Sequence, residues 1–117
     1  MKTMKAYNVQ IWCGLKETYD DEKIHTIEDV RVICDDFVNS IKDCITITPT
    51  EYRYVDGNEP GVIVGWIQYP RFPRKKKEIK RRALLLAKRL MYELYQYRVT
   101  VTTPSQSIML ENNTVQR

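Results

Sequence analysis

Lysine and arginine side chains at one predicted helix start are the residues of this sequence with the clearest capacity to bind a ligand. Five of them fall between positions 71 and 77: Arg71, Arg74, Lys75, Lys76 and Lys77. Cations at a helix N-terminus oppose the helix dipole, and a bound anion relieves both this opposition and their mutual repulsion. The cluster therefore predicts a phosphate-binding site. The alternative is a solvated helix face that binds nothing.

Aromatic and amide side chains on one face of a predicted sheet form the second candidate site. Residues 7–13 alternate between apolar and polar positions, as a half-buried strand does. The alternation places Asn8, Gln10 and Trp12 on the face away from the core. Trp66, in the strand over residues 62–69, is assigned to the same outer face, which then carries both tryptophans of the chain. The sequence therefore predicts ligand contacts at these four residues.

Other strand positions are expected to share this outer face. They are Thr46, Thr48, Val64, Thr100 and Thr102, joined by Tyr52 and Tyr54 if the alternation continues through Pro49. A bulge at Pro49 would reverse the two tyrosines. So large an exposed aromatic surface usually marks an interface. The candidates to cover it are a nucleic acid strand, a nucleotide-like molecule, another protein or a second copy of the chain.

Groups that commonly carry out catalysis are scarce in this chain. His25 is the only histidine, so no histidine pair can form, and a catalytic base also needs an orienting partner. Asp20, Asp21 and Glu22 could bind a divalent ion loosely but lack calcium-loop spacing. The three cysteines show no C-x-x-C spacing and are expected to be buried, reduced thiols. We expect no catalytic residue, metal site, cofactor or enzymatic activity.

Charge is distributed unevenly along the chain. The net charge is +4, but residues 17–36 hold eight acidic and two basic side chains, whereas residues 71–89 hold ten basic and one acidic. Such a bipolar molecule steers an anionic partner toward its basic end, or favours contact between the unlike ends of two copies.

Helix and strand patterns follow one another in an informative order. Thr26 is the predicted N-cap of a helix that extends to about residue 41, because apolar residues recur there every three or four positions. Residues 44–55 and 62–69 form a strand hairpin. A second helix has Pro73 in its first turn and ends near Tyr97. The last main strand covers residues 99–102 and has a short partner at 108–110.

This order of strand, helix, strand, strand, helix and strand predicts an α+β fold of the ferredoxin-like type. The expected sheet is antiparallel, with both helices on one face and an extra C-terminal strand. With 117 residues, 43% of them hydrophobic, we expect one domain at residues 1–111 and a flexible tail at 112–117. No apolar segment approaches the ~20 residues that span a bilayer. We expect no membrane contact and a cytoplasmic protein.

Two ferredoxin-like families can be compared with this chain at the level of motifs. RNA-recognition motifs carry alternating aromatic residues in the strand that corresponds to residues 61–69, where this chain has Val62, Val64, Trp66 and Gln68. Acylphosphatases carry an arginine-bearing anion loop that has no counterpart here. The match to the first family is poor, and the motif of the second is not found.

The segments YNVQIWCGL (residues 7–15), EPGVIVGWIQYPRFP (59–73) and 99–110 resemble small uncharacterised proteins of tailed bacteriophages and prophages. This resemblance spans most of the chain. It implies an accessory phage protein in the bacterial cytoplasm, where such proteins take over host factors or counter host defence. It implies no catalytic residue and no ligand.

We therefore expect a small non-enzymatic binding protein, a phage accessory or anti-host factor. It would engage a nucleotide or nucleic acid through the aromatic sheet face and the basic helix start. The alternative is a protein that antagonises a host enzyme or defence protein by binding it. We also expect a homo-oligomer, because the sheet face is too apolar to stay bare.

Overall fold

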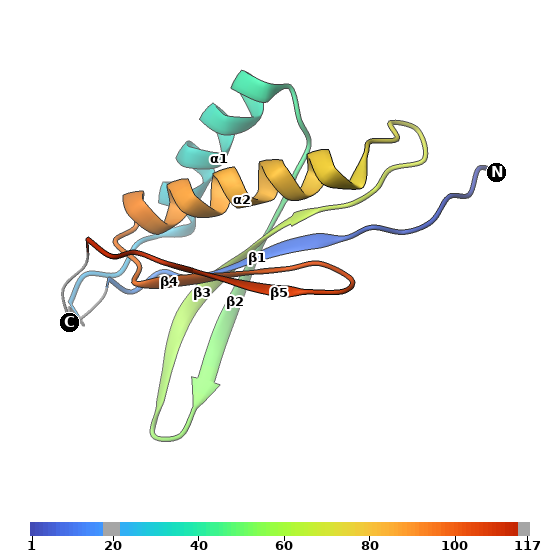
Figure 1. Cartoon of the computed structure of the whole chain (residues 1–117). Coiled ribbons are helices and arrows are strands. Elements are labelled where there is room, and N and C mark those ends of the chain that lie inside the picture. The colour runs from blue at the N-terminus through green and yellow to red at the C-terminus, as the bar shows by residue number, and fades with distance from the viewer. Residues whose placement is uncertain (18–21, 115–117) are drawn as a thin grey trace.

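The computed structural model describes residues 1–17 and 22–114 of the chain (Figure 1). Asp20 and Asp21, considered above as ion ligands, lie outside the described residues, as does the end of the predicted tail at 115–117. The described elements are, in chain order, β1 (Val9–Gly14), α1 (Ile27–Ile41), β2 (Thr46–Tyr54), β3 (Gly57–Trp66), α2 (Lys76–Glu93), β4 (Arg98–Thr102) and β5 (Ser107–Glu111).

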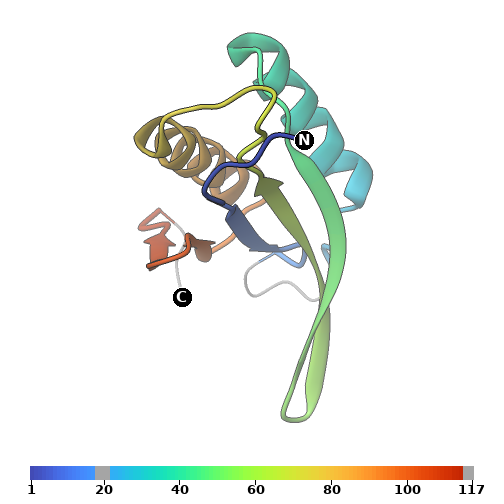
Figure 2. The same cartoon turned by 90° about the vertical axis from the view of Figure 1, so that its right-hand side faces the viewer.

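The strands form one sheet in the order β2-β3-β1-β4-β5, and every neighbouring pair is antiparallel. Both helices cover the same face, which leaves the other face, called the outer face below, uncovered (Figures 1 and 2). This is the predicted ferredoxin-like fold with β5 added beside β4. β2 lies at an edge of the sheet, where Pro49 is tolerated although it has no backbone N–H to donate.

Pairing between β2 and β3 decides which side chains reach the outer face. The register continues without a bulge through Pro49, so Tyr52 and Tyr54 stay on the outer face with Thr46 and Thr48. The sequence predicts this arrangement for an unbroken strand.

The assignment of Val64 and Trp66 to the outer face is wrong. Both are buried, at 0% and 2% exposure. Residues opposite each other in an antiparallel pair share a face, and outward-facing Thr46 lies opposite Gly65. The outer face of β3 therefore holds Gly65 and Ile63. Because this strand is apolar on both sides, its own pattern contained no signal for which side is buried.

Each helix buries one apolar stripe against the sheet. Thr26 caps α1 through a capping box with Asp29, as predicted, and α2 packs on β1 and β4. The core is formed by these stripes and the inner strand positions, including Val9, Ile11, Val30, Ile33, Phe37, Val62, Val64, Ile79, Leu86, Leu90, Val99 and Val101.

Helix α2 covers Lys76–Glu93. It is therefore shorter than the predicted helix over residues 73–97. Gln68 binds the backbone just before it: its amide accepts from the Arg74 N–H (2.9 Å) and donates to the Arg74 carbonyl (2.6 Å). At the other end Tyr95 adopts a positive φ of 52°. This left-handed residue turns the chain out of the helix toward β4.

The β2–β3 hairpin projects beyond the rest of the sheet (Figures 1 and 2). β1 reaches only to Gly14 opposite Gly61, so residues 51–59, called the hairpin arm below, pair only with each other among the described strands. Tyr54 and Val55 on this arm are 54% and 89% exposed.

The cysteines and the chain end differ in part from expectation. Cys13 and Cys34 are buried as predicted, but Cys44 is exposed. Asn112, assigned to the tail, is buried, donates its backbone N–H to the Tyr97 carbonyl (2.8 Å) and accepts hydrogen bonds from Thr114. Among the described helices, none has the length and apolar character needed to cross a membrane.

Candidate functional site

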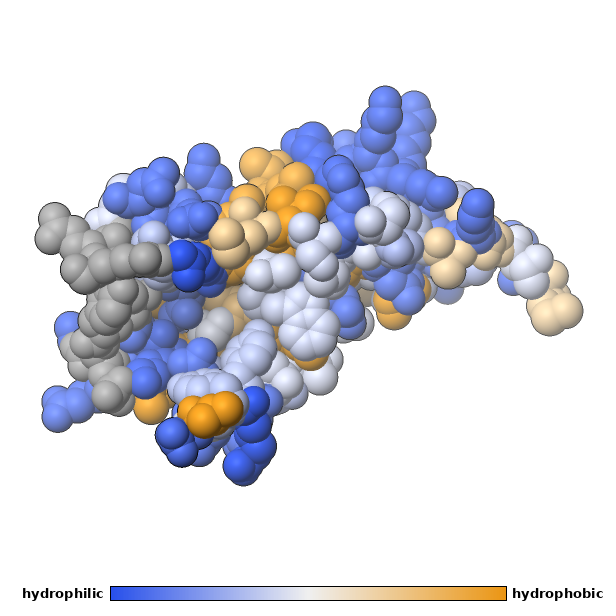
Figure 3. Space-filling view, turned by 60° about the horizontal axis from the view of Figure 1, so that its bottom comes forward, coloured by the Kyte–Doolittle hydropathy of each residue, from blue (hydrophilic) through white to orange (hydrophobic). Residues whose placement is uncertain are grey.

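The outer face contains a hollow of about 220 Å³, called the outer-face pocket below. Figure 3 shows this side of the molecule, whose middle is pale, the colour of weakly polar residues, with strongly hydrophilic residues around much of it. Segments far apart in the sequence meet at this pocket. It is lined by Trp12, Gly14, Tyr52, Glu59, Gln96, Arg98 and Thr100.

A pair of glycines keeps part of this face free of side chains. Gly14 of β1 lies opposite Gly61 of β3, and neither has a positive φ that would itself favour glycine. A Cβ on Gly61 would lie 2.2 Å from the Tyr52 ring. Glycine is therefore needed at position 61 for space, because the tyrosine ring lies against the backbone there.

Tyr52 and Glu59 are cross-strand partners beside these glycines. Burial raises the pKa of Tyr52 to about 12, and the negative charge of Glu59 acts in the same direction. Tyr52 is therefore a neutral phenol that can donate a hydrogen bond at physiological pH, and Glu59 provides the carboxylate of the pocket.

Trp12 and Arg98 stand on neighbouring strands at the pocket. The Trp12 ring is half-buried, and its Nε1 donates to Thr102 Oγ1 at 3.0 Å, which fixes the indole on the outer face. The Arg98 guanidinium stacks on the Tyr97 ring, 4.6 Å from its centroid. The pocket thus combines two aromatic rings, a phenolic donor, a carboxylate and a guanidinium.

Of the residues predicted to bind a ligand, Trp12 lines the outer-face pocket. Asn8 and Gln10 are exposed. Gln10 is on the same strand face as Trp12, but neither it nor Asn8 lines the pocket. Ligand contacts at these two residues stay predictions.

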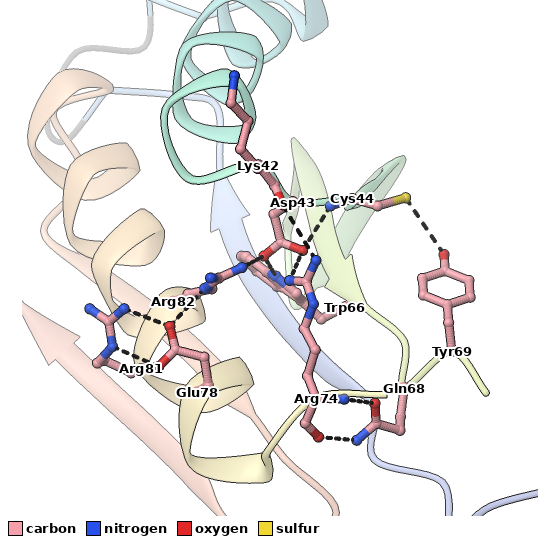
Figure 4. A network of polar contacts seen from close by, with 10 residues as sticks. All are labelled: Lys42, Asp43, Cys44, Trp66, Gln68, Tyr69, Arg74, Glu78, Arg81 and Arg82. Carbon is pink, nitrogen blue, oxygen red and sulfur yellow. Dashed lines mark hydrogen bonds and ion pairs between the residues drawn. The ribbon is translucent and has the colours of Figure 1, made fainter. Parts of the chain in front are cut away.

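Trp66 and Arg74 instead belong to a buried polar network (Figure 4). The Asp43 side chain, 2% exposed, accepts a hydrogen bond from Trp66 Nε1 (2.9 Å) and pairs with Arg74 and with Arg82 (3.2 Å). Burial by itself would raise the pKa of Asp43. The bonds from Trp66, the Cys44 backbone N–H and the two arginines hold it below its ordinary value. Arg74 is therefore paired with a carboxylate within the protein, and ligand binding by its partly exposed side chain stays a prediction.

The other predicted cations remain at the surface. A second cavity, of about 400 Å³, is lined in part by four lysines, Lys5, Lys76, Lys77 and Lys80. Lys75 is exposed, and the Arg71 guanidinium lies 5.2 Å from the centroid of the Phe72 ring. Anion binding at this basic cavity stays a prediction.

Sequence reasoning missed Gly14, Glu59, Gln96 and Arg98 as pocket residues. Glu59 was assigned to a turn and Gln96 to the end of a helix, so neither was expected to face a strand surface. Glycine inside a strand often marks a close approach of another group to the backbone, but the predicted strands ended at residue 13 and began at residue 62, which left Gly14 and Gly61 outside them.

The groups considered first for catalysis lie in ordinary structural settings. His25 contacts Glu17 (2.9 Å) and Asp29 (3.4 Å). Burial raises the pKa of the Cys13 and Cys34 thiols to about 12, so neither is a thiolate at neutral pH. Within residues 1–17 and 22–114, no cluster of three or more histidine, cysteine or carboxylate side chains could hold a metal ion.

Neither a protein-family model nor a curated protein sequence matches this chain. Two solved structures do share its fold: a phage SAM lyase in complex with S-methyl-5'-thioadenosine, and phage SAM lyase in its apo state. Each has a TM-score of 0.77 and 16% sequence identity, over 99% of this chain and 98% of the solved one. At this identity the likeness establishes the fold, and it is consistent with a phage origin.

The same comparison corrects the expected function. A non-enzymatic binding protein was expected, with an antagonist of a host protein as the alternative. The solved structures that match from end to end are those of an enzyme, and one of them holds a small molecule rather than a nucleic acid or a protein. The chain thus has the fold of phage SAM lyase over nearly its whole length, which contradicts the expectation that it is not an enzyme.

Proposed function

We propose that this protein is an enzyme that cleaves S-adenosylmethionine and releases S-methyl-5'-thioadenosine, and that it binds its substrate in the outer-face pocket. The observation that carries the proposal is the fold shared over 99% of the chain with a lyase that was solved with S-methyl-5'-thioadenosine bound. The chemistry of the pocket supports it independently.

S-adenosylmethionine combines a flat adenine, a sulfonium cation and an amino acid end with an ammonium and a carboxylate. Its net charge is positive near neutral pH. Aromatic rings attract both flat bases and onium cations, and the pocket offers Trp12 and Tyr52. Glu59 adds a carboxylate that attracts the cationic substrate. The residue types in the pocket therefore match the groups of this substrate.

Release of the thioether requires one bond to break, between the sulfur and the γ-carbon of the amino acid part, with the electron pair going to sulfur. The substrate's own carboxylate can form the replacing bond at that carbon, which closes a five-membered lactone. The products are S-methyl-5'-thioadenosine and homoserine lactone. No water, proton acceptor or cofactor enters this balance, which suits a pocket lined by neither histidine nor cysteine.

The protein's own task in such a reaction is to hold the substrate folded and to keep water from it. The sulfonium and the carboxylate lose their opposite charges together in the transition state, so water stabilises the ground state more strongly. Trp12 and Tyr52 provide weakly hydrated surface for this, and Glu59 orients the cationic substrate. In an infected cell, loss of S-adenosylmethionine would withdraw the methyl donor of methylation-dependent host defence.

The proposal is tested by incubating the purified chain with S-adenosylmethionine and measuring both products by mass spectrometry. We expect homoserine lactone without incorporation of labelled oxygen from water. Replacing Glu59→Gln should lower kcat/KM by about tenfold or more, the effect of losing a hydrogen bond or ion pair to a charged group.

Glu51→Gln is the matched control for this experiment, because Glu51 adjoins Tyr52 on β2 and therefore faces the opposite side of the hairpin arm. It should leave kcat/KM unchanged. Formation of S-methyl-5'-thioadenosine no faster than in buffer would refute the activity. An unchanged rate with Glu59→Gln would refute the location of the site.

A further inference from the structure

Gln96 is a buried polar side chain whose orientation is fixed by its neighbours. It is 7% exposed. Its Nε2 donates to the carbonyl oxygens of Lys16 (2.8 Å) and Leu94 (3.0 Å). Rotating the amide by 180° would place its oxygen against these two carbonyls, so the assignment of nitrogen and oxygen is unambiguous. The Oε1 atom must therefore point the other way, toward the outer-face pocket.

Oε1 of Gln96 is an acceptor without a donor. Among the described residues, no hydrogen bond to this oxygen is formed, and the oxygen is not among the buried unpartnered atoms, so it is open to the pocket. The same side chain lines the outer-face pocket. An acceptor that is open to a pocket and not used by the protein is available to a donor on a ligand.

The absence of a side chain at Gly14 lets a second acceptor approach the same place. A Cβ on Gly14 would lie 2.9 Å from Gln96 Oε1 and 3.4 Å from Glu59 Oε1. The φ of Gly14 is not positive, so the backbone conformation does not require glycine here. The small residue instead leaves room beneath two converging oxygens, one from an amide and one from a carboxylate.

We propose that Gln96 and Glu59 form an ammonium subsite above Gly14, which binds the α-ammonium of the amino acid part of the substrate. This inference rests on the proposed function. Two acceptors, one of them charged, suit a group with several N–H donors and a positive charge, and repel a carboxylate. An alkylammonium has three such donors. Binding the ammonium leaves the substrate's carboxylate free to turn toward the γ-carbon.

The subsite makes the pocket selective for ligands that keep the amino acid part. S-adenosylhomocysteine keeps the α-ammonium but lacks the sulfonium, so it has no activated bond for the carboxylate to displace. S-methyl-5'-thioadenosine lacks the amino acid part altogether. The difference in affinity between these two ligands therefore measures contacts to the amino acid part, and the change of that difference in a variant of Gln96 or Gly14 measures the ammonium subsite.

The experiment measures binding of both ligands by calorimetry to the parent chain and two variants. Gly14→Ala fills the space beneath the acceptors and displaces Gln96 Oε1, which would lie 2.9 Å from the added Cβ. Gln96→Met removes the acceptor at similar side-chain length. Each variant should weaken binding of S-adenosylhomocysteine by about tenfold or more, as expected for a lost hydrogen bond to a charged group. Each should change the affinity for S-methyl-5'-thioadenosine by less than about twofold.

Gln106→Met, in the turn between β4 and β5 at the opposite end of β4, is the control and should affect neither ligand. If Gly14→Ala and Gln96→Met weaken binding of both ligands equally, Gln96 only supports the fold and the proposed subsite is overturned. Unchanged binding of S-adenosylhomocysteine would overturn it as well. If the parent chain binds neither ligand, the proposed function itself fails, a result distinct from a loss of selectivity.

Discussion

The two tryptophans show how differently one residue type is used on the two faces of the sheet. Trp12 is half-buried on the outer face, lines the pocket and is fixed by one hydrogen bond to Thr102. Trp66 is 2% exposed under the helices, and its Nε1 donates to the carboxylate of Asp43 at 2.9 Å. The first lines the pocket in which we propose that the substrate binds, and the second belongs to the core.

Alanine at each position should separate these roles. Trp12→Ala should weaken binding of S-methyl-5'-thioadenosine by about tenfold, since stacking of a base on an aromatic ring contributes ~1–3 kcal/mol. It should lower the free energy of unfolding by only about 1–2 kcal/mol. Trp66→Ala should lower it by about 3–5 kcal/mol, because the substitution leaves a cavity and removes a donor from Asp43.

Urea unfolding and calorimetry on the two variants provide the measurements. A loss of 3 kcal/mol or more with Trp12→Ala, on the scale of a fully buried ring, would show that the indole supports the core. Normal ligand affinity with Trp12→Ala would remove this residue from the pocket.

At the level of elements, the link between α1 and β2 is joined to two distant parts of the chain. Asp43 in this link binds Trp66 of β3, Arg74 just before α2 and Arg82 within α2 (Figure 4). One carboxylate thereby fixes the start of α2 against the sheet. Arg74, one of the two arginines expected to bind a phosphate, is already paired with this carboxylate.

Asp43→Asn should destabilise the fold and make the free energy of unfolding depend less on pH in the acid range. The pKa of Asp43 is lowered in the folded state, so its stabilisation is complete above the ordinary aspartate value, about 3.9, and is lost as pH falls through the folded-state value. The variant should lose about 3–5 kcal/mol of unfolding free energy at pH 7, because two arginines remain near an uncharged amide. Below about pH 4 the difference should shrink.

Urea unfolding between pH 7 and pH 2 tests this, with Asp29→Asn as the control. The pKa of Asp29 is also lowered, by the hydrogen bond from the Thr26 backbone, but this carboxylate is exposed. Its replacement should destabilise less at every pH. A difference between Asp43→Asn and the parent that stays constant down to pH 2 would show that Asp43 does not titrate differently in the folded state.

At the level of the whole molecule, the helices protect one face of the sheet and leave the other uncovered. The chain is elongated, at 48 × 31 × 24 Å, and the hairpin arm projects from it (Figure 2). Exposed apolar side chains stand at both edges of the outer face, Tyr54 on β2 and Met109 on β5, each 54% exposed. Such a surface is a candidate for contact between copies, as expected from the sequence.

We expect sedimentation at micromolar concentration to show a homo-oligomer. Tyr54→Ser together with Met109→Ser should shift it toward the 13.9 kDa monomer, because the change removes apolar surface from the contact. Leu85→Ser, at a 47% exposed position of α2, is the control and should leave the assembly unchanged. A parent chain that sediments only as the monomer would refute the expectation.

The sequence by itself determined the order of the elements and, through it, the ferredoxin-like fold. Helix periodicity and strand alternation are local properties, so Thr26 as a cap and Trp12 and Tyr52 on the outer face could be predicted. Alternation does not show which side is buried in a strand that is apolar on both sides. The burial of Trp66 therefore could not be predicted.

Only the tertiary structure decided which charged side chains form ion pairs within the protein and where a pocket lies. Arg74 looks like a surface cation in the sequence, but its partner Asp43 lies 31 positions earlier. The outer-face pocket needs Gly14, Glu59 and Gln96 from three separate segments, and no local spacing relates them. The expectation of a non-enzymatic protein relied on missing histidine and metal motifs. The proposed reaction, in which the substrate supplies both the nucleophile and the leaving group, requires neither, so the absence of these motifs does not argue against it.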